Sequence, residues 1–397
     1  MDRAVPWGNG AAFAAFIMRR RGHLGWTQEE LSERSGVSVR TIRNIETGKV
    51  GSPRRSSLAM LLAALDKKGG QQPSVPGSAQ VLREHDVNTL VHALRSRRLV
   101  VVTGPGGVGK SRLALETAYR AAPLPDDRGV ADLGQLPPED SPAAPSFQEV
   151  ADDVGRRLPG PPYGTRPELL VLDNVEHLPV TVTRLSARLL NDRPRLRVVV
   201  TTRRRLTVGG AWTWEVQPLS TDGPGGAAAF FVHRVREVCH GLSLDPGGQD
   251  VLALCRMLDG IPGYLELAAE RLRSLPLAAL VADGAALAGL TGSDLSLLPH
   301  QRGVLPSVRW SLGLLDPAQR ALLHDLVKLP PRFTLQDVRH ATAPGTVTSD
   351  IELLDALSRL VDCSLVQVVR DGDRYKYGLM STVRSALTRE RRPAPAH

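Results

Sequence analysis

The stretch RLVVVTGPGGVGKS, residues 98–111, decides the fold of this chain. Its first half is an apolar run typical of a buried strand, and its second half fits the pattern G-x-x-x-x-G-K-[ST] in full. Glycines in such a loop let backbone N–H groups close around phosphate oxygens, and the helix that follows presents the positive end of its dipole to the anion. Because the helical segment SRLALETAYRAA follows directly, the sequence predicts a phosphate-binding loop between a strand and a helix.

This loop predicts a binding site for ATP or ADP together with Mg²⁺. Lys110 would reach the β- and γ-phosphates, and the Ser111 hydroxyl would coordinate the metal ion. The residues expected to contact the nucleotide form one continuous run: Gly104, Pro105, Gly106, Gly107, Val108, Gly109, Lys110, Ser111 and Arg112.

Further apolar segments follow the loop at intervals long enough for helices. Strands are expected at 129–133, 169–173 and 195–202, with helical patterns between them. Apolar strands that alternate with helices indicate a parallel sheet covered on both faces. We therefore expect a P-loop α/β nucleotide-binding domain over residues 81–220.

The end of the strand at 169–173 carries candidates for metal binding and catalysis. Asp173 ends the segment LLVLD, 63 residues after Lys110, where a Mg²⁺-binding acid is expected. The next residue is Asn174 rather than a second acid, so Glu176 is the nearest carboxylate that could orient an attacking water. Glu176 fits a solvated loop or helix start equally well, and hydrolysis of ATP is therefore left open, with at most a weak ATPase activity expected.

The strand at 195–202 delivers a cation to the same edge of the sheet. Arg203 can pair with a γ-phosphate and so report whether that phosphate is present. Arg204 and Arg205 follow directly, so a basic loop is the alternative, and the assignment to Arg203 depends on its position. The predicted catalytic residues are Lys110, Asp173, Glu176 and Arg203, and the predicted metal ligands are Ser111 and Asp173.

The N-terminal segment TQEELSERSGVSVRTIRNIETGK, residues 27–49, predicts two short helices joined by a tight turn. Thr27 and Glu30 form a capping-box pattern, and the first helix ends at Gly36. Ser38 then caps a second helix over residues 39–46. A helix, a glycine-containing turn and a second helix is the arrangement that reads double-stranded DNA.

The outward face of the second helix carries side chains suited to base edges. Arginine can bind guanine through two hydrogen bonds, asparagine can bind adenine, and valine can contact a thymine methyl group. Gln28, at the start of the first helix, is expected to bind a phosphate. The alternative is a small helical bundle that binds proteins. The predicted DNA-contacting residues are Gln28, Ser38, Val39, Arg40, Arg43 and Asn44.

Composition bounds the class of protein. Of the 397 residues, 42% are hydrophobic and 23% are charged, which is ordinary for a globular chain of two to four domains. Residues 1–70 supply +6 of the formal net charge of +9, so the small N-terminal domain favours a polyanionic partner. Three scattered cysteines give no metal or disulfide pattern. The apolar run at 11–18 is too short for a signal peptide or a membrane span, so we expect a cytoplasmic protein without membrane contact.

The expected fold class is multidomain, α and α/β. Residues 1–70 would form an all-α helix-turn-helix domain, followed by a Gly/Pro/Ser/Gln-rich linker at 71–80. After the parallel-sheet core, residues 221–298 are expected to form a helical domain. Residues 299–397 give helices and then two strands joined by a DGD turn, the pattern of a C-terminal winged helix.

Two resemblances cover nearly the whole chain. Residues 27–49 resemble the XRE, or phage-repressor, family of helix-turn-helix proteins. From about Val81 onward the chain resembles the NB-ARC-type nucleotide switch of the STAND signalling ATPases, and most of all the actinobacterial transcriptional regulators of that class. The matching segments, in family order, are the P-loop, LLVLDNVEHL, VVVTTRRRL, LDGIPGYLELAAERL and YGLMSTVRSAL.

The second resemblance implies roles that the residues alone do not. Pro262 would pack against the adenine, and Arg83 would lie near the base. The winged helix would close over bound ADP in an inactive state, which exchange for ATP would open. Three positions depart from the family: Gly263 stands where relatives have leucine, and Met380 and Ser381 stand where many relatives have a His-Asp pair that contacts ADP.

Two functions of different classes remain open. The first is an ATP/ADP-switched transcriptional regulator that binds an operator in double-stranded DNA. The second is a STAND-type signalling or defence ATPase whose N-terminal bundle is a protein-interaction adaptor. A nucleic-acid-remodelling motor is disfavoured, because no helicase-type motif occurs. A homo-oligomer is expected because a single DNA-reading module buries little surface. The resemblance also implies helical or propeller repeats that sense a signal in most relatives. Here a separate sensor protein, the nucleotide ratio or the winged helix itself is expected to take that role.

Overall fold

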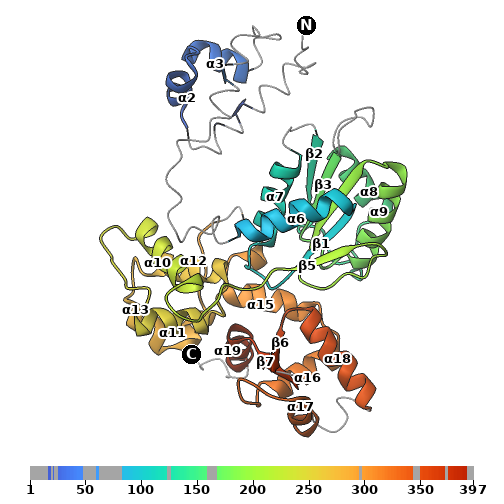
Figure 1. The fold of residues 1–397 in the computed structure, drawn as a ribbon, viewed down its shortest axis with the longest axis vertical. Coiled ribbons are helices and arrows are strands. Elements are labelled where there is room, and N and C mark those ends of the chain that lie inside the picture. Colours follow the sequence, from blue (N-terminus) through green and yellow to red (C-terminus); the bar gives the residue numbers. More distant parts are fainter. Residues whose placement is uncertain are drawn as a thin grey trace. The chain divides into compact units, whose positions relative to one another are not determined.

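The computed structural model describes residues 17–18, 21, 26–47, 60–61, 83–122, 127–158, 168–294, 297–342, 349–371 and 374–390. They belong to two compact units, Met1–Val75 and Pro76–His397, which are considered separately below (Figure 1). The predicted linker at 71–80 and the turn at Gly372 and Asp373 lie outside the described residues.

The N-terminal unit contains the two predicted helices, α2 (Gln28–Ser35) and α3 (Val39–Glu46). Both halves of the expected capping box form at the start of α2, and Gly36 ends that helix in the left-handed conformation with φ of 68°. Ser38 caps α3 through the Thr41 N–H. The apolar side chains that hold this unit together are buried: Ile17, Leu31, Val37, Ile42, Ile45 and Leu61.

The larger unit is built on a five-stranded sheet in the order β2-β3-β4-β1-β5, in which every neighbouring pair is parallel. β1, β3 and β4 are almost wholly buried, which explains their continuous apolar sequences. The edge strand β5 was not predicted, because its sequence WTWE is short and only half-buried. The strands are β1 (Leu99–Thr103), β2 (Arg128–Asp132), β3 (Glu168–Asp173), β4 (Leu196–Thr201) and β5 (Trp212–Glu215).

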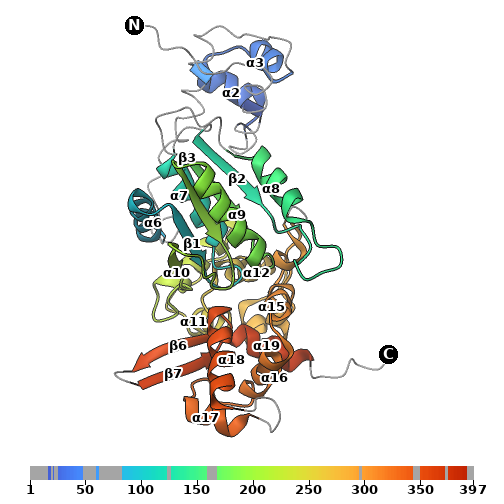
Figure 2. The same ribbon diagram turned by 90° about the vertical axis from the view of Figure 1, so that its right-hand side faces the viewer.

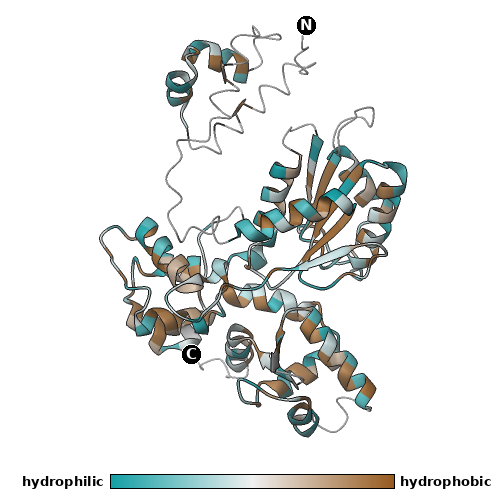
Figure 3. Ribbon diagram, in the orientation of Figure 1, coloured by the Kyte–Doolittle hydropathy of each residue, from teal (hydrophilic) through white to brown (hydrophobic). Residues whose placement is uncertain are grey.

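Helices cover both faces of this sheet, as the alternating sequence predicts (Figures 1 and 2). One face packs against α6 (Glu84–Ser96) and α7 (Lys110–Ala121), and the other against α8 (Phe147–Arg156) and α9 (Pro179–Asp192). Hydrophobic colour in Figure 3 therefore concentrates on the strands, while the outer surfaces of these helices are hydrophilic. This arrangement directs the carboxyl ends of β1, β3 and β4 to one edge.

Two further groups of elements complete the larger unit, here called the helical module (226–288) and the C-terminal module (299–390). They share one continuous apolar core rather than two separate ones. The helical module consists of α10 (Gly226–Val238), α11 (Gln249–Met257), α12 (Pro262–Arg271), α13 (Leu277–Ala282) and α14 (Gly284–Ala288). The C-terminal module consists of η2 (Pro299–Gln301), α15 (Val304–Gly313), α16 (Pro317–Leu326), α17 (Leu335–Ala341), α18 (Asp350–Asp362), β6 (Val366–Asp371), β7 (Arg374–Leu379) and α19 (Ser381–Glu390).

The predicted hairpin is present in the C-terminal module (Figure 2). β6 and β7 pair antiparallel, from Val366 opposite Leu379 to Asp371 opposite Arg374. Phe333 adds a bridge to Tyr377 on the outer side of β7. Within the part of the chain that is described, no helix combines the length and the apolar character that crossing a membrane requires.

Candidate functional site

The loop between β1 and α7 has a backbone that only glycine adopts readily. Gly104, Gly107 and Gly109 have φ of 143°, 80° and 102°. A Cβ atom on Gly104 would lie 2.7 Å from the Val216 carbonyl oxygen, and one on Gly106 would lie 2.4 Å from a side-chain oxygen of α15. Glycine is therefore required here both for conformation and for space, as in loops whose backbone N–H groups bind anions.

Lys110 is buried at the start of α7 and folds back over the loop. Its Nζ donates hydrogen bonds of 2.8 Å to the carbonyl oxygens of Gly104 and Pro105. Burial, assisted by the nearby charge of Arg203, lowers the pKa of Lys110 to about 7. A phosphate placed in the loop would reverse this effect, since a negative charge favours the protonated amine.

A cavity of about 320 Å³ opens beside the loop. Its walls come from the phosphate loop, the start of α6, the strand ends, α12 and the start of the C-terminal module. The cavity is therefore bounded by the helical module on one side and the C-terminal module on the other. The predicted site residues that line it are Arg83, Gly106, Gly107, Val108, Gly109, Lys110, Ser111, Arg112, Glu176, Arg203 and Pro262.

Oxygen ligands suited to a divalent cation meet at the ends of α7 and β3. The buried Asp173 carboxylate accepts hydrogen bonds from the hydroxyls of Ser111 and Thr201. Burial raises the pKa of Asp173, despite these bonds. No group of three or more His, Cys, Asp or Glu side chains converges on one point among the described residues. Two protein oxygens completed by phosphates and water fit Mg²⁺, which retains several waters and rarely occupies an all-protein site.

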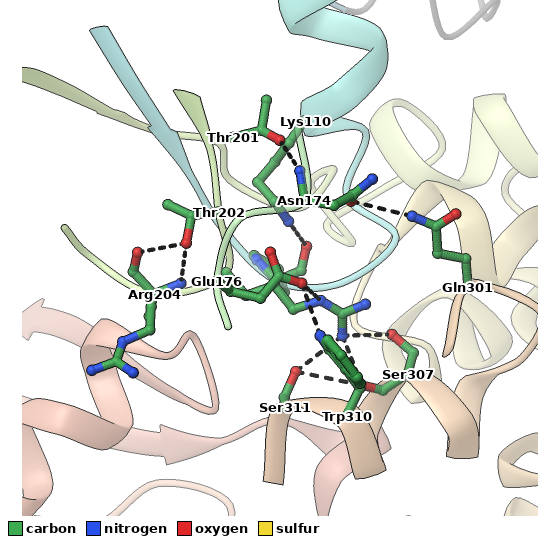
Figure 4. Close-up of polar contacts among 12 residues, drawn as sticks. Lys110, Asn174, Glu176, Thr201, Thr202, Arg204, Gln301, Ser307, Trp310 and Ser311 are labelled. Atoms are coloured by element: carbon green, nitrogen blue, oxygen red, sulfur yellow. Dashed lines mark hydrogen bonds and ion pairs between the residues drawn. The ribbon is translucent and has the colours of Figure 1, made fainter. Parts of the chain in front are cut away.

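Asn174 follows Asp173 and takes a left-handed conformation with φ of 58°. Its amide nitrogen donates a 2.9 Å hydrogen bond to Asp132 at the end of β2. Its amide oxygen accepts a 3.2 Å hydrogen bond from Gln301 of η2 (Figure 4). Asn174 thus connects two strand ends with the C-terminal module. Asp132 was missed by sequence reasoning, because nothing in the segment RGVAD marks its last residue as part of a site.

The guanidinium of Arg203 joins the sheet to α15, in a set of contacts here called the Arg203 junction. Its Nε lies 3.1 Å from a carboxylate oxygen of Glu176, and both side chains are at most 5% exposed. Its Nη1 donates to the Ser307 carbonyl oxygen at 2.7 Å and to the hydroxyls of Ser307 and Ser311 at 3.1 Å each. Arg203 is buried beside Glu176, whereas Arg204 points away from Glu176 in Figure 4. The role of Arg203 as a γ-phosphate sensor stays a prediction.

Glu176 is held on its other side by Trp310 of α15, whose indole Nε1 donates at 2.9 Å (Figure 4). The solvated-loop alternative for Glu176 does not hold, because the residue is only 2% exposed. Burial acts to raise the pKa of Glu176, but the charges of Arg203 and Lys110 outweigh it and leave that pKa below its ordinary value. Glu176 is therefore an ionised partner of Arg203 in this arrangement.

Two histidines enclose Trp310 and were not singled out by sequence reasoning. The His300 ring stacks on the indole at 4.2 Å, and the His177 ring meets it edge-on at 5.5 Å. Burial lowers the pKa of His300 to about 4, so this ring is neutral at physiological pH. The only sequence signal for this cluster would have been two histidines and a tryptophan near otherwise charged loops.

Arg83 and α12 form another part of the cavity wall. Arg83 donates 2.7 Å to the Gln217 carbonyl oxygen and 3.3 Å to that of Val108, which fixes its guanidinium near the loop. Gly263 donates its N–H to the Gly107 carbonyl oxygen at 3.0 Å, and a Cβ there would lie 3.1 Å from that oxygen. Glycine at position 263 therefore lets the start of α12 touch the phosphate loop.

In the N-terminal unit, the predicted reading face lies along α3. Arg40 and Arg43 are exposed, and Val39 and Asn44 are half-buried. The amide of Gln28 donates 2.6 Å to Glu46 and accepts 3.3 Å from Arg43, so it bridges α2 and α3. Arg21 completes this network with a 2.8 Å ion pair to Glu46. The role of Gln28 at a DNA phosphate stays a prediction.

The sheet order, the glycine loop and the buried lysine define a P-loop ATPase fold. A solved structure titled the Walker-type ATPase PABY2304 of Pyrococcus abyssi shares this fold, with a TM-score of 0.55 and 16% identity, covering 79% of this chain and 98% of that one. At the N-terminus, the helix-turn-helix family matches residues 17–70. The chain thus joins an XRE-type helix-turn-helix to a P-loop ATPase fold.

Two mycobacterial proteins are similar to this chain over about three quarters of its length. A Mycobacterium tuberculosis protein named "Putative HTH-type transcriptional regulator Rv0890c" is 35% identical over 301 residues, which are 73% of this chain and 33% of that protein. This chain therefore spans about a third of that relative's length. The uncharacterized protein Rv0894 of Mycobacterium tuberculosis is 32% identical over 322 residues, which are 76% of this chain and 78% of that protein. The chain belongs to the family of Rv0894.

Proposed function

We propose that this chain is a transcriptional regulator in which ATP or ADP, bound with Mg²⁺ at the phosphate loop, controls DNA binding by the helix-turn-helix. Lys110 would exchange its two backbone carbonyl partners for the β- and γ-phosphates. Ser111 and Asp173 would hold Mg²⁺, whose charge would lower the pKa that burial raises in Asp173. Arg83 and Pro262 would contact the base.

One observation carries this proposal: Arg203 lines the cavity and at the same time binds the start of the C-terminal module. A γ-phosphate entering the cavity offers the guanidinium a second anionic partner. Arg203 would then leave the two serines of α15, whereas ADP would leave the present contacts intact. Because the phosphate interacts differently with the two arrangements, it can shift the equilibrium between them.

The resemblance to the NB-ARC-type switch of STAND proteins supports the same direction of change. The closed arrangement, with the C-terminal module docked as a winged helix, would be the ADP state. Glu176 is occupied by Arg203 and Trp310, so it is not positioned to orient a water in this state. ATP hydrolysis would therefore be weak until Arg203 moves.

In the N-terminal unit, α3 would enter the major groove of an operator. Arg40 and Asn44 would read base edges, with Val39 and Arg43 beside them and Ser38 at the start of the helix. The exposed guanidiniums of Arg40 and Arg43 fit this role. We also propose a homodimer on a two-fold operator, because a single DNA-reading module buries little surface. Sedimentation in the presence of ATP and DNA tests this.

Retardation of DNA from upstream of the chain's own gene tests the function. We expect binding that falls steeply with salt and differs between ADP and a non-hydrolysable ATP analogue. Arg40→Ala combined with Asn44→Ala should abolish sequence preference, and Lys110→Ala should abolish the nucleotide effect. Equal retention with ADP, with the analogue and without nucleotide would refute the switch. Nucleotide-dependent assembly without any DNA retention would instead support the adaptor function.

A further inference from the structure

A second set of polar contacts joins the C-terminal module to the helical module, and it does not involve Arg203. Asp259 lies in the turn between α11 and α12, and its carboxylate accepts three hydrogen bonds from the start of α19. The donors are the Ser381 N–H at 2.8 Å, the Thr382 N–H at 2.9 Å and the Thr382 hydroxyl at 2.7 Å. These contacts are here called the Asp259 junction.

The Asp259 junction caps α19 from outside its own segment. The first N–H groups of a helix have no partner within that helix, and a residue just before the helix usually supplies one. Met380 precedes α19 and has no side-chain acceptor of that kind. The carboxylate of Asp259 satisfies two backbone donors and also faces the positive end of the helix dipole. The helical module therefore provides the cap that α19 lacks.

The backbone at this turn is arranged to present that carboxylate. Asp259 has φ of 54° and Gly260 has φ of 63°, so two successive residues are left-handed. Aspartate tolerates this conformation better than most residues but still at a cost of about 1 kcal/mol. A Cβ on Gly260 would lie 2.1 Å from the Leu219 carbonyl oxygen, which fixes the turn against the chain leading into α10. The backbone conformation of the turn and its packing against Leu219 therefore fix the position of the carboxylate.

The junction is directly linked to the phosphate loop. Asp259 is separated from Pro262 by two residues, and the neighbouring Gly263 is hydrogen-bonded to Gly107. On the other side, Met380 and Thr382 line the same narrow gap as Pro105 and Gly106. A movement of the C-terminal module away from the helical module would break the three hydrogen bonds to Asp259.

We propose that Asp259 is the positioning residue that keeps the C-terminal module closed over a bound nucleoside diphosphate, and that breaking its hydrogen bonds to α19 sets the rate of nucleotide release. This inference rests on the proposed nucleotide switch. The nucleotide itself is not touched by Asp259, so affinity for ADP changes through the closed state alone.

Dissociation of a fluorescent methylanthraniloyl-ADP from the full chain tests this inference. Thr382→Val removes one donor from a buried residue at nearly constant volume, and Thr382→Ser retains the hydroxyl. Asp259→Gly removes the carboxylate and keeps a left-handed backbone without strain. We expect dissociation about tenfold faster for Thr382→Val, as loss of one charge-assisted hydrogen bond implies, faster still for Asp259→Gly, and near wild type for Thr382→Ser.

Thr388→Val is the matched control, because Thr388 lies on α19 but its hydroxyl donates only to the Arg384 carbonyl oxygen. Wild-type dissociation rates for both Thr382→Val and Asp259→Gly would overturn the inference. So would equal acceleration by Thr388→Val, since that would indicate general weakening of α19. If the wild-type chain does not bind the fluorescent ADP at all, it is the proposed function that fails.

Discussion

The Arg203 junction and the Asp259 junction fix the same module to the rest of the larger unit, with opposite chemistry. At the first, the sheet supplies a cation, and α15 supplies two serines and a backbone carbonyl. At the second, the helical module supplies an anion, and α19 supplies three donors. One junction fixes the beginning of the C-terminal module, and the other fixes its end.

The difference between the junctions lies in what a nucleotide can reach. Arg203 lines the cavity, so a γ-phosphate can compete with Ser307 and Ser311 for its guanidinium. Asp259 does not line that cavity, and as an anion it would repel a phosphate. In the proposed switch, the first junction would therefore detect the nucleotide, while the second would only resist or permit the movement that follows. A switch requires both properties, since detection without resistance would leave the module open at all times.

The largest expected effect is that of removing the cation from the Arg203 junction. Arg203→Gln leaves the ionised Glu176 buried without its partner, and the free energy of unfolding should fall by about 3–5 kcal/mol. Arg204→Gln is the matched control and should cost less than about 1 kcal/mol. Combining Arg203→Gln with Glu176→Gln should recover much of the loss in urea titrations. A single variant no less stable than the control would contradict the buried ion pair.

Lys110→Ala should abolish the effect of the nucleotide on the two junctions. We expect binding of a fluorescent ATP analogue to weaken about 100-fold or more, because the phosphates lose their charge-assisted donor. Hydrogen exchange at α15 and α19 should then be the same with and without the analogue, whereas in the wild type α15 should respond. Arg120→Ala, which alters an exposed side chain near the other end of the same helix and outside the cavity, should retain the response. An unchanged affinity in Lys110→Ala would contradict the assignment of the phosphate loop.

The sequence predicts the parts of this site that depend on local pattern. A glycine loop between a strand and a helix, and a strand that ends in aspartate, can each be recognised within about a dozen residues. Helices α2 and α3 can also be recognised locally, because Thr27 and Ser38 cap their N-termini and Gly36 caps the C-terminus of α2. These features need no knowledge of distant contacts, and the structure has them at the predicted residues.

The two junctions could not be predicted in this way. Arg203 and Ser307 are 104 residues apart, and Asp259 and Thr382 are 123 residues apart. Asp259 reads as an ordinary turn residue before glycine, and Thr382 as an ordinary helix-start residue. Only the packing of α15 and α19 into a core shared with the helical module brings these partners together. The missed edge strand β5 has the same cause, since its pairing with β1 and not its composition makes it a strand.

Acid should weaken the Arg203 junction through His300. Its pKa is about 4 in the folded protein and ordinarily 6.5, so the unfolded chain binds the proton more tightly. Stability from this group is present above pH 6.5 and is lost as the pH falls toward 4, by about 2 kcal/mol between pH 7 and pH 5. His300→Phe preserves an aromatic ring beside Trp310 and should flatten this dependence in thermal unfolding. The exposed His240, changed to Phe as a control, should leave the slope as it is.

The smallest and sharpest effect is that of Ser311→Ala, which removes one hydroxyl from the Arg203 junction. Loss of a single hydrogen bond should weaken the closed state by about 1 kcal/mol with ADP or without nucleotide. With a non-hydrolysable ATP analogue the variant should match the wild type, because Arg203 would already have left α15. Thr382→Val should instead weaken the closed state under every nucleotide condition. The protease susceptibility of the C-terminal module measures the stability of the closed state in both variants. If the γ-phosphate changes the effect of Ser311→Ala and that of Thr382→Val equally, the two junctions open together, and Arg203 alone does not detect the nucleotide.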